Sequence, residues 1–236
     1  DSTVLVTAVM SQHPKNADYF PLAVDYEEKY YAAGKIKGSK WLKREGRPSD
    51  EAILTSRVID RSIRPRFNSN IRHEVQVVPT VLTFDAINDP DMPALFGASL
   101  ALMLSDIPFA GPVAGVRVGR VDGKLLINPT YEERARSDFD IIVAGTANKI
   151  NMIEAGAKIV PEKDITEAIN HGFKELQKLT KFQQKITDEL GKEKKLLAVF
   201  THDEALLAIV RNFSEEKLAA ALYAPGKTKS EFYEGL

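Results

Sequence analysis

The sequence predicts an α+β fold, a mixed sheet with packed helices followed by a small all-helical part. Strand-like segments rich in β-branched residues dominate the first two thirds of the chain, and segments with helical spacing of apolar residues lie among them and after them. Strand and helix do not alternate regularly, which argues against a doubly wound parallel sheet. The 236 residues are 44% hydrophobic and 28% charged, values that exclude disordered, collagen-like and coiled-coil proteins.

The first half of the chain contains three predicted strands and one predicted helix. The strands cover residues 3–9, 20–26 and 75–84. Pro79 lies inside the third segment, and because proline has no N–H to donate, we expect this strand at a sheet edge or at a bulge. Residues 92–106 form a helix that is apolar on nearly all sides, which predicts a central, covered position.

The second half begins with strands and continues with a helix. Asp122-Gly123 separates two apolar stretches within residues 117–127, and this spacing predicts a two-residue hairpin. From Pro161 onward, apolar residues recur at helical spacing as far as Phe182, which predicts one long amphipathic helix. Two further strands are expected between the hairpin and this helix, at residues 139–144 and 150–155.

The last part of the chain has a purely helical pattern. Thr201 followed by Glu204 predicts a capping box, and Ser214 is expected to begin another helix. We therefore divide the chain into a first domain, residues 1–186, and a partial all-helical domain, residues 187–236.

Charge and composition narrow the class of protein. The 32 basic and 33 acidic side chains give a formal net charge of -1, and cysteine is absent, which excludes disulfide scaffolds and thiolate metal sites. No apolar run is long enough for a membrane helix and no signal peptide opens the chain, so we expect a cytoplasmic protein without a membrane partner. The chain starts in strand-like sequence without an initiating Met, which indicates a piece of a longer polypeptide.

Residues 35–72 form a basic segment with eleven Lys or Arg against four acidic residues. Within it, a loop bounded by glycine and proline sets Trp41 beside three cations, Lys43, Arg44 and Arg47. Aromatic faces stack on bases and cations bind phosphates, so this composition suits single-stranded nucleic acid. We expect the segment to bind a polyanion.

A helix capped by Ser49 follows this loop. At 100° per residue, Arg57, Arg61 and Arg64 fall within a stripe about 60° wide on that helix. This arginine ridge either contacts RNA or forms ion pairs, inside the chain between Asp60 and Arg64 or across subunits. The residues alone leave these alternatives open.

Two groups of carboxylates are candidate metal ligands. Asp85, Asp89 and Asp91 cluster in a loop and could hold a hard cation, but a solvated turn is the favoured interpretation. Asp138 and Asp140 share one face of a strand, where capping of the strand start and a partner arginine are favoured over a metal.

Residues 41–67, WLKREGRPSDEAILTSRVIDRSIRPRF, closely resemble the signature of the polynucleotide phosphorylase family. The first core domain of that family typically reads Phe-Phe-Arg-Arg-x-Gly-Arg-Pro-Ser, followed by a helix that ends Ile-Asp-Arg-Pro-Ile-Arg-Pro-Leu-Phe. The similarity continues through Tyr31-Ala32-Ala33-Gly34, Gly97-Ala98-Ser99-Leu100, Ile127-Asn128-Pro129-Thr130, Val143-Ala144-Gly145-Thr146 and residues 152–158. The resemblance implies an RNase PH-like (ribosomal protein S5 domain 2-like) fold for residues 1–186, and the family's all-helical linker domain for the remainder.

The resemblance also implies a function for the parent protein. It implies a polyribonucleotide nucleotidyltransferase that degrades mRNA from the 3′ end with inorganic phosphate, releases nucleoside diphosphates and uses Mg²⁺ in its second core domain. It further implies a homotrimeric ring that threads single-stranded RNA. In that scheme Arg61 and Arg64 support a neighbouring active site or the interface between the two halves. The channel entrance is lined by Trp41, Leu42, Lys43, Arg44 and Arg47.

Two departures from the family pattern place the chemistry outside this chain. In the family's second core domain, serines before the Gly-Ala-Ser-Leu helix hold the attacking phosphate, whereas this chain has Asp89-Pro90-Asp91 there. That domain's two metal-binding aspartates correspond to Arg134 and Asp140, so one ligand is lost and its charge is reversed. We therefore expect no catalytic residue and no cofactor in this chain, which would be the non-catalytic, RNA-guiding and assembly half.

Two other functions are considered. The chain could be a stand-alone RNA-binding or ring-assembly subunit without a catalytic half, which the coding sequence beyond Leu236 would reveal. A single-domain RNase PH enzyme active by itself is disfavoured by the same two departures.

Overall fold

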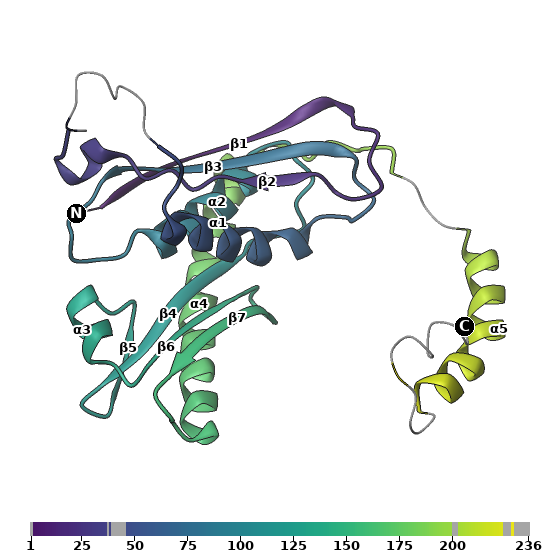
Figure 1. Cartoon of the computed structure of the whole chain (residues 1–236). Coiled ribbons are helices and arrows are strands. Elements are labelled where there is room, and N and C mark those ends of the chain that lie inside the picture. The colour runs from purple at the N-terminus through teal and green to yellow at the C-terminus, as the bar shows by residue number, and fades with distance from the viewer. Residues whose placement is uncertain (1, 37, 39–45, 200–202, 224–227, 229–236) are drawn as a thin grey trace. The chain divides into compact units, whose positions relative to one another are not determined.

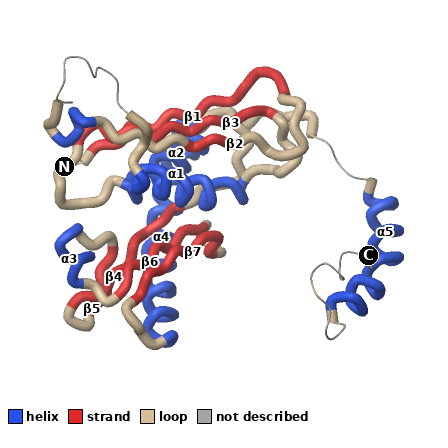
Figure 2. The backbone as a smooth tube through the Cα atoms, viewed as in Figure 1, coloured by secondary structure: helices blue, strands red, loops and turns tan. Residues whose placement is uncertain are grey.

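The structure is a computed structural model that describes residues 2–36, 38, 46–199, 203–223 and 228. The chain forms two compact units, residues 1–197 and residues 198–236. The first unit contains two sheets and most of the helices, as Figures 1 and 2 show. This confirms the predicted α+β class.

The first sheet has three strands in the order β1-β3-β2. β1 (Thr3–Pro14) runs antiparallel to β3 (His73–Thr83), and β2 (Leu22–Val24) runs parallel to it. The expectation that Pro79 marks an edge or a bulge is wrong, because β3 is the central strand. Beyond the end of β2 at Val24, Pro79 faces the segment that follows: its carbonyl oxygen accepts from the N–H of Glu27 at 2.8 Å, and the N–H of Val81 donates to the carbonyl of Glu27 at 2.9 Å. The contact on this side therefore lacks only the N–H that proline does not have.

The second sheet is antiparallel throughout, with the strand order β5-β4-β6-β7. The predicted hairpin is confirmed: β4 and β5 are joined by Asp122 and Gly123, whose φ angles of 51° and 76° are those of a two-residue turn with positive φ at both positions. The two later predicted strands are confirmed as well. The bounds are β4 Ala114–Val121, β5 Lys124–Ile127, β6 Phe139–Gly145 and β7 Ile150–Ala157.

The helices of the first unit pack on and between the sheets (Figure 1). α2 is the predicted central helix, with Leu95, Ala98 and Leu102 fully buried. The predicted long helix is α4, and Ala168 and Leu176 on it join the core formed by the inner face of β4 and β6. The bounds are α1 Asp50–Ile63, α2 Asp91–Leu104, α3 Tyr131–Arg136 and α4 Glu162–Leu190, with short 3₁₀ turns η1 Tyr30–Ala33 and η2 Arg64–Arg66.

Gly172 allows α4 to lie close to the second sheet. A Cβ atom at this position would lie 2.8 Å from Val118 Cγ2. We expect Gly172→Ala to lower the free energy of unfolding by about 1 to 2 kcal/mol, because overpacking exceeds the gain of about 1 kcal/mol in helix propensity. Gly156→Ala is the control, since its Cβ would meet nothing within 4 Å, and a change under about 0.5 kcal/mol is expected there. Equal effects in urea unfolding would contradict the packing explanation.

The C-terminal end of the first unit extends past the predicted domain boundary. α4 continues to Leu190, and the extended residues that follow are held against the end of α2 by Lys194. Lys194 Nζ donates to the carbonyl oxygens of Leu102, Met103 and Ser105 at 2.7, 2.9 and 2.6 Å. The domain division after residue 186 stays a proposal.

The second unit contains α5 (Glu204–Leu222), whose N-cap is Asp203. The Asp203 side chain accepts hydrogen bonds from the backbone N–H groups of Ala205 and Leu206. Thr201, the predicted cap, lies outside the described residues. The expected new helix at Ser214 is wrong, because α5 runs through this position without interruption.

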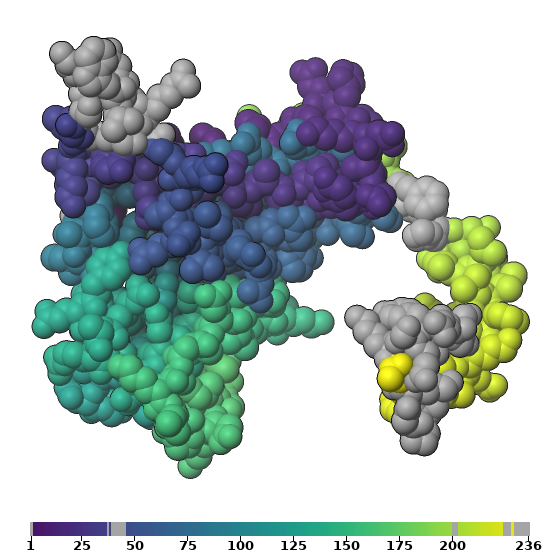
Figure 3. All heavy atoms as spheres, in the orientation of Figure 1, coloured from purple at the N-terminus to yellow at the C-terminus, as the bar shows by residue number. Residues whose placement is uncertain are grey.

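On the face drawn in Figure 3, the N-terminal strands and α1 lie directly against the later part of the first unit. Within the described part of the chain, no helix combines the length and the apolar character that crossing a membrane requires.

Candidate functional site

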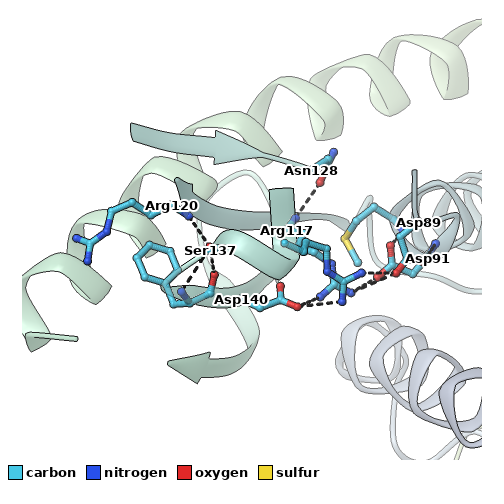
Figure 4. Close-up of polar contacts among 10 residues, drawn as sticks. Asp89, Asp91, Arg117, Arg120, Asn128, Ser137 and Asp140 are labelled. Atoms are coloured by element: carbon cyan, nitrogen blue, oxygen red, sulfur yellow. Dashed lines mark hydrogen bonds and ion pairs between the residues drawn. The ribbon is translucent and has the colours of Figure 1, made fainter. Parts of the chain in front are cut away.

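Five charged side chains meet between the second sheet, α2 and α3. We call them the charged cluster: Asp89, Asp91, Arg117, Arg134 and Asp140. Figure 4 shows Asp140 on one side, and Asp89 and Asp91 on the other, converging on the guanidinium group of Arg117. Residues far apart in sequence are joined here because β4 pairs with β6 and α2 begins beside β4.

Arg117 is the centre of the charged cluster. Its Nη1 donates to Asp140 Oδ2 at 2.6 Å, and its Nη2 donates to Asp91 Oδ2. Arg134 closes the ring from α3: its Nη1 donates to Asp89 Oδ2 at 2.7 Å and its Nη2 to Asp140 Oδ2 at 3.0 Å. The cluster therefore pairs two guanidinium groups with three carboxylates, which leaves an excess of one negative charge.

Burial makes these ion pairs energetically important. Arg117 is 9% exposed and Asp91 is 4% exposed. Burial raises the pKa of the Asp91 carboxyl, and the attraction of Arg117 opposes that rise. Burial also disfavours the charge on Arg117, but Asp91 and Asp140 outweigh it and hold the pKa of the guanidinium above its ordinary value. Arg117 therefore stays charged in the fold.

The backbone of β4 fixes the position of Arg117. Its N–H donates to Asn128 Oδ1 at 2.9 Å, and Asn128 N–H donates back to the Arg117 carbonyl at 2.7 Å. Asn128 has a φ of 49°, a left-handed conformation that asparagine tolerates better than most residues. The turn after β5 is thus hydrogen-bonded to β4 at Arg117, the central residue of the charged cluster.

The favoured interpretation of Asp138 and Asp140, a partner arginine, is confirmed. Arg120 Nε donates to Asp138 Oδ2 at 2.9 Å, while Asp140 pairs with both arginines of the charged cluster. The solvated-turn interpretation is confirmed for Asp85, because its Oδ1 accepts from the backbone N–H groups of Ile87 and Asn88. It is wrong for Asp91, which lies in the first turn of α2, is 4% exposed and pairs with Arg117. Among the described residues, no group of three His, Cys, Asp or Glu side chains is arranged to hold a metal ion.

The residues present in the charged cluster do not fit a divalent metal or a phosphate. Asp140 Oδ2 already accepts from two guanidinium groups, and two cations in this position would repel a metal ion. A phosphate would have to displace carboxylates from both arginines, and three negative charges would repel it.

Sequence reasoning missed Arg117. The available signal was an arginine inside a strand of otherwise apolar and small residues, the stretch Ala114–Val118, because a charge in such a position needs buried partners. The pattern could not identify those partners, because they come from β6 and from the start of α2.

The predicted RNA-binding residues are only partly described. Arg47 and Arg61 are exposed, the first in the loop before α1 and the second on its last turn. Arg64 donates to Asp60 through Nε at 2.9 Å and Nη2 at 2.6 Å, which confirms the pair considered from the sequence. The remaining predicted residues, Trp41, Leu42, Lys43 and Arg44, lie outside the described residues.

Arg64 also has partners outside α1. Its Nη1 donates to the carbonyl oxygen of Phe20 at 3.2 Å, and its Nη2 to that of Leu22 at 3.1 Å. These contacts tie α1 to β2. The structure thus gives Arg64 a role in holding the fold, and its predicted role at a neighbouring site stays a prediction.

Comparison with known proteins finds two family matches. The family described as "3′ exoribonuclease family, domain 1" matches residues 1–108, and "3′ exoribonuclease family, domain 2" matches residues 111–175. The two matched segments correspond to the two sheets of the first unit with their helices.

Curated relatives extend the similarity into the second unit. The chain is 51% identical over 227 residues to polyribonucleotide nucleotidyltransferase of Geobacillus kaustophilus, covering 96% of this chain and 31% of the relative. It is 49% identical over 231 residues to the protein of the same name in Bacillus subtilis, covering 98% of this chain and 33% of the relative. The chain thus spans about a third of the length of these relatives.

A solved structure supports the fold. The crystal structure of rice (Oryza sativa) Rrp46 matches with a TM-score of 0.62 and 12% sequence identity, covering 79% of this chain and 84% of that one. The predicted RNase PH-like fold is confirmed.

Proposed function

The chain belongs to the 3′ exoribonuclease (RNase PH) family, and from that membership we propose that it is the non-catalytic, RNA-guiding and assembly half of a phosphate-dependent 3′-to-5′ exoribonuclease. The parent protein would be a polyribonucleotide nucleotidyltransferase of cytoplasmic mRNA decay, as its relatives' names suggest. It would act as a homotrimer on single-stranded RNA, consuming inorganic phosphate and releasing nucleoside diphosphates.

The charged cluster is the observation that carries the proposal. Phosphorolysis needs groups that hold the attacking phosphate and stabilise charge on the transferring phosphoryl group. In this chain the two arginines of the charged cluster, Arg117 and Arg134, are already engaged by Asp89, Asp91 and Asp140. This half therefore holds neither phosphate nor Mg²⁺, and chemistry falls to the second core domain of the parent.

The exposed cations of the basic segment support the guiding role. Arg47 and Arg61 have no hydrogen-bond or ion-pair partner among the described residues, and both are accessible to a polyanion. A stand-alone RNA-binding or assembly subunit remains the alternative. The identity of 49% to 51% to relatives three times as long favours the fused enzyme.

The first test is phosphorolysis by the purified chain. We expect no release of nucleoside diphosphates from oligoriboadenylate in phosphate and Mg²⁺, because the charged cluster cannot hold the nucleophile. Thin-layer chromatography of radiolabelled products measures this, and the full-length parent serves as the positive control. Measurable turnover by the chain alone, abolished by Asp140→Asn, would show that the cluster is catalytic and overturn the proposal.

A further inference from the structure

A cavity of about 500 Å³ opens beside the charged cluster, between α1, the second sheet and the segment that follows β2. Its volume lies in the range of small-molecule sites. One wall is apolar and comes from α1, β3 and β6. That wall contains Leu54, Val58, Val81 and Ile142.

Aromatic rings form a second part of the lining. Tyr26 is buried, and Phe84 and Tyr131 meet edge to face with ring centroids 6.1 Å apart. Faces of aromatic rings attract organic cations.

The charges that line the cavity are predominantly negative. Six carboxylates and four cationic side chains contribute, and both arginines are engaged inside the charged cluster. Three of the carboxylates lie outside that cluster. Glu51 and Glu154 have no hydrogen-bond or ion-pair partner among the described residues, and the partner of Glu28 is the neutral hydroxyl of Ser49, at 2.7 Å.

Two buried polar atoms beside the cavity also lack a partner within the described chain. They are Asp140 Oδ1 and Arg117 Nε. The pKa values of two tyrosines in the lining are raised, in part by these negative charges. Burial, together with Asp89 and Asp91, raises the pKa of Tyr131 to about 12, and burial followed by Asp89 and Glu28 raises the pKa of Tyr26.

We propose that this cavity binds an aliphatic polyamine, with its ammonium groups on Glu28, Glu51 and Glu154 and its methylene chain along the apolar and aromatic walls. A polyamine alternates cationic and apolar segments, as the lining alternates carboxylates with rings and aliphatic side chains. A nucleotide or free phosphate would meet an excess of negative charge. This inference goes beyond the proposed function and does not depend on it.

Isothermal titration calorimetry of the purified chain with spermidine, without RNA, tests the proposal. We expect saturable binding with one site per chain, and chemical-shift changes centred on Tyr131 and Leu54 in a parallel NMR titration. The double variant Glu51→Gln/Glu154→Gln should bind roughly tenfold more weakly, because two exposed charge contacts are removed. Both residues are exposed, so the variant is expected to keep the melting temperature of the parent chain.

The control Glu189→Gln/Glu216→Gln removes two exposed carboxylates of α4 and α5 and should leave the dissociation constant unchanged. Equal weakening in both double variants would assign the binding to diffuse surface charge and overturn the proposal. The absence of saturable binding would overturn it as well. Inorganic phosphate is titrated separately, and shift changes at Tyr131 with phosphate but not with spermidine would identify an anion site instead.

Discussion

Replacing Arg117 by methionine should lower the free energy of unfolding by about 3 to 5 kcal/mol, because Asp91 then remains buried without a cation. The side chain of Asp91 is 6% exposed, and among the described residues Arg117 is the cation that it contacts. Asp89 and Asp140 keep Arg134 as a partner, at 2.7 and 3.0 Å, so the loss falls mainly on Asp91. Urea unfolding followed by circular dichroism measures the change.

Two further variants test whether the destabilisation comes from the unpaired Asp91 or would follow the removal of any arginine. Arg136→Met removes an exposed ion pair with Asp122, whose side chains are 57% and 81% exposed, and should cost less than about 1 kcal/mol. Arg117→Met/Asp91→Leu removes both members of the buried pair and should regain most of the stability, to within about 2 kcal/mol of the parent chain. If the double variant is less stable than Arg117→Met, the unpaired charge is not the cause.

The combined substitution Lys43→Ala/Arg44→Ala/Arg47→Ala should weaken binding to single-stranded RNA by roughly two orders of magnitude near 50 mM salt. Each phosphate contact on a single strand contributes about 0.7 to the slope of log affinity against log salt, so three lost contacts flatten that slope by about 2. Fluorescence anisotropy with a labelled oligoriboadenylate across a salt series measures both quantities.

A matched control removes three exposed cations elsewhere. Lys178→Ala/Lys181→Ala/Lys185→Ala on α4 makes the same change in net charge and should leave the salt slope close to that of the parent chain. An unchanged slope in the variant of the basic loop would reassign that loop to contacts between subunits. An equal loss in both variants would indicate attraction by net charge alone.

Much of the fold could be predicted because local patterns carry it. The alternation in β1, the Asp122-Gly123 turn and the apolar surface of α2 each determine an element within a few residues of chain. The prediction for Pro79 was wrong because the missing N–H of a proline weakens a sheet only where a neighbouring strand offers an acceptor to it. That neighbour, the end of β2, is a matter of sheet order.

The candidate site divides in the same way. Its basic loop and arginine ridge are local in sequence, and the family resemblance was visible in residues 41–67 alone. In the sequence, the charged cluster was visible only as two departures from the family pattern, at Asp89-Pro90-Asp91 and at Arg134. Arg117, which joins these residues, was not identified. The apolar and small neighbours of Arg117 along the chain indicate a charge that needs buried partners, but they do not indicate which residues those partners are.

By itself, the sequence determined the α+β class, most of the strands and helices, and the family. Only the tertiary structure decided how the charged side chains pair: Arg117 pairs with Asp140 across β4 and β6, and with Asp91 at the start of α2. It also decided that six carboxylates line one cavity. The physical reason is that burial and pairing depend on residues far apart in the chain, whereas element type follows from side chains a few positions apart.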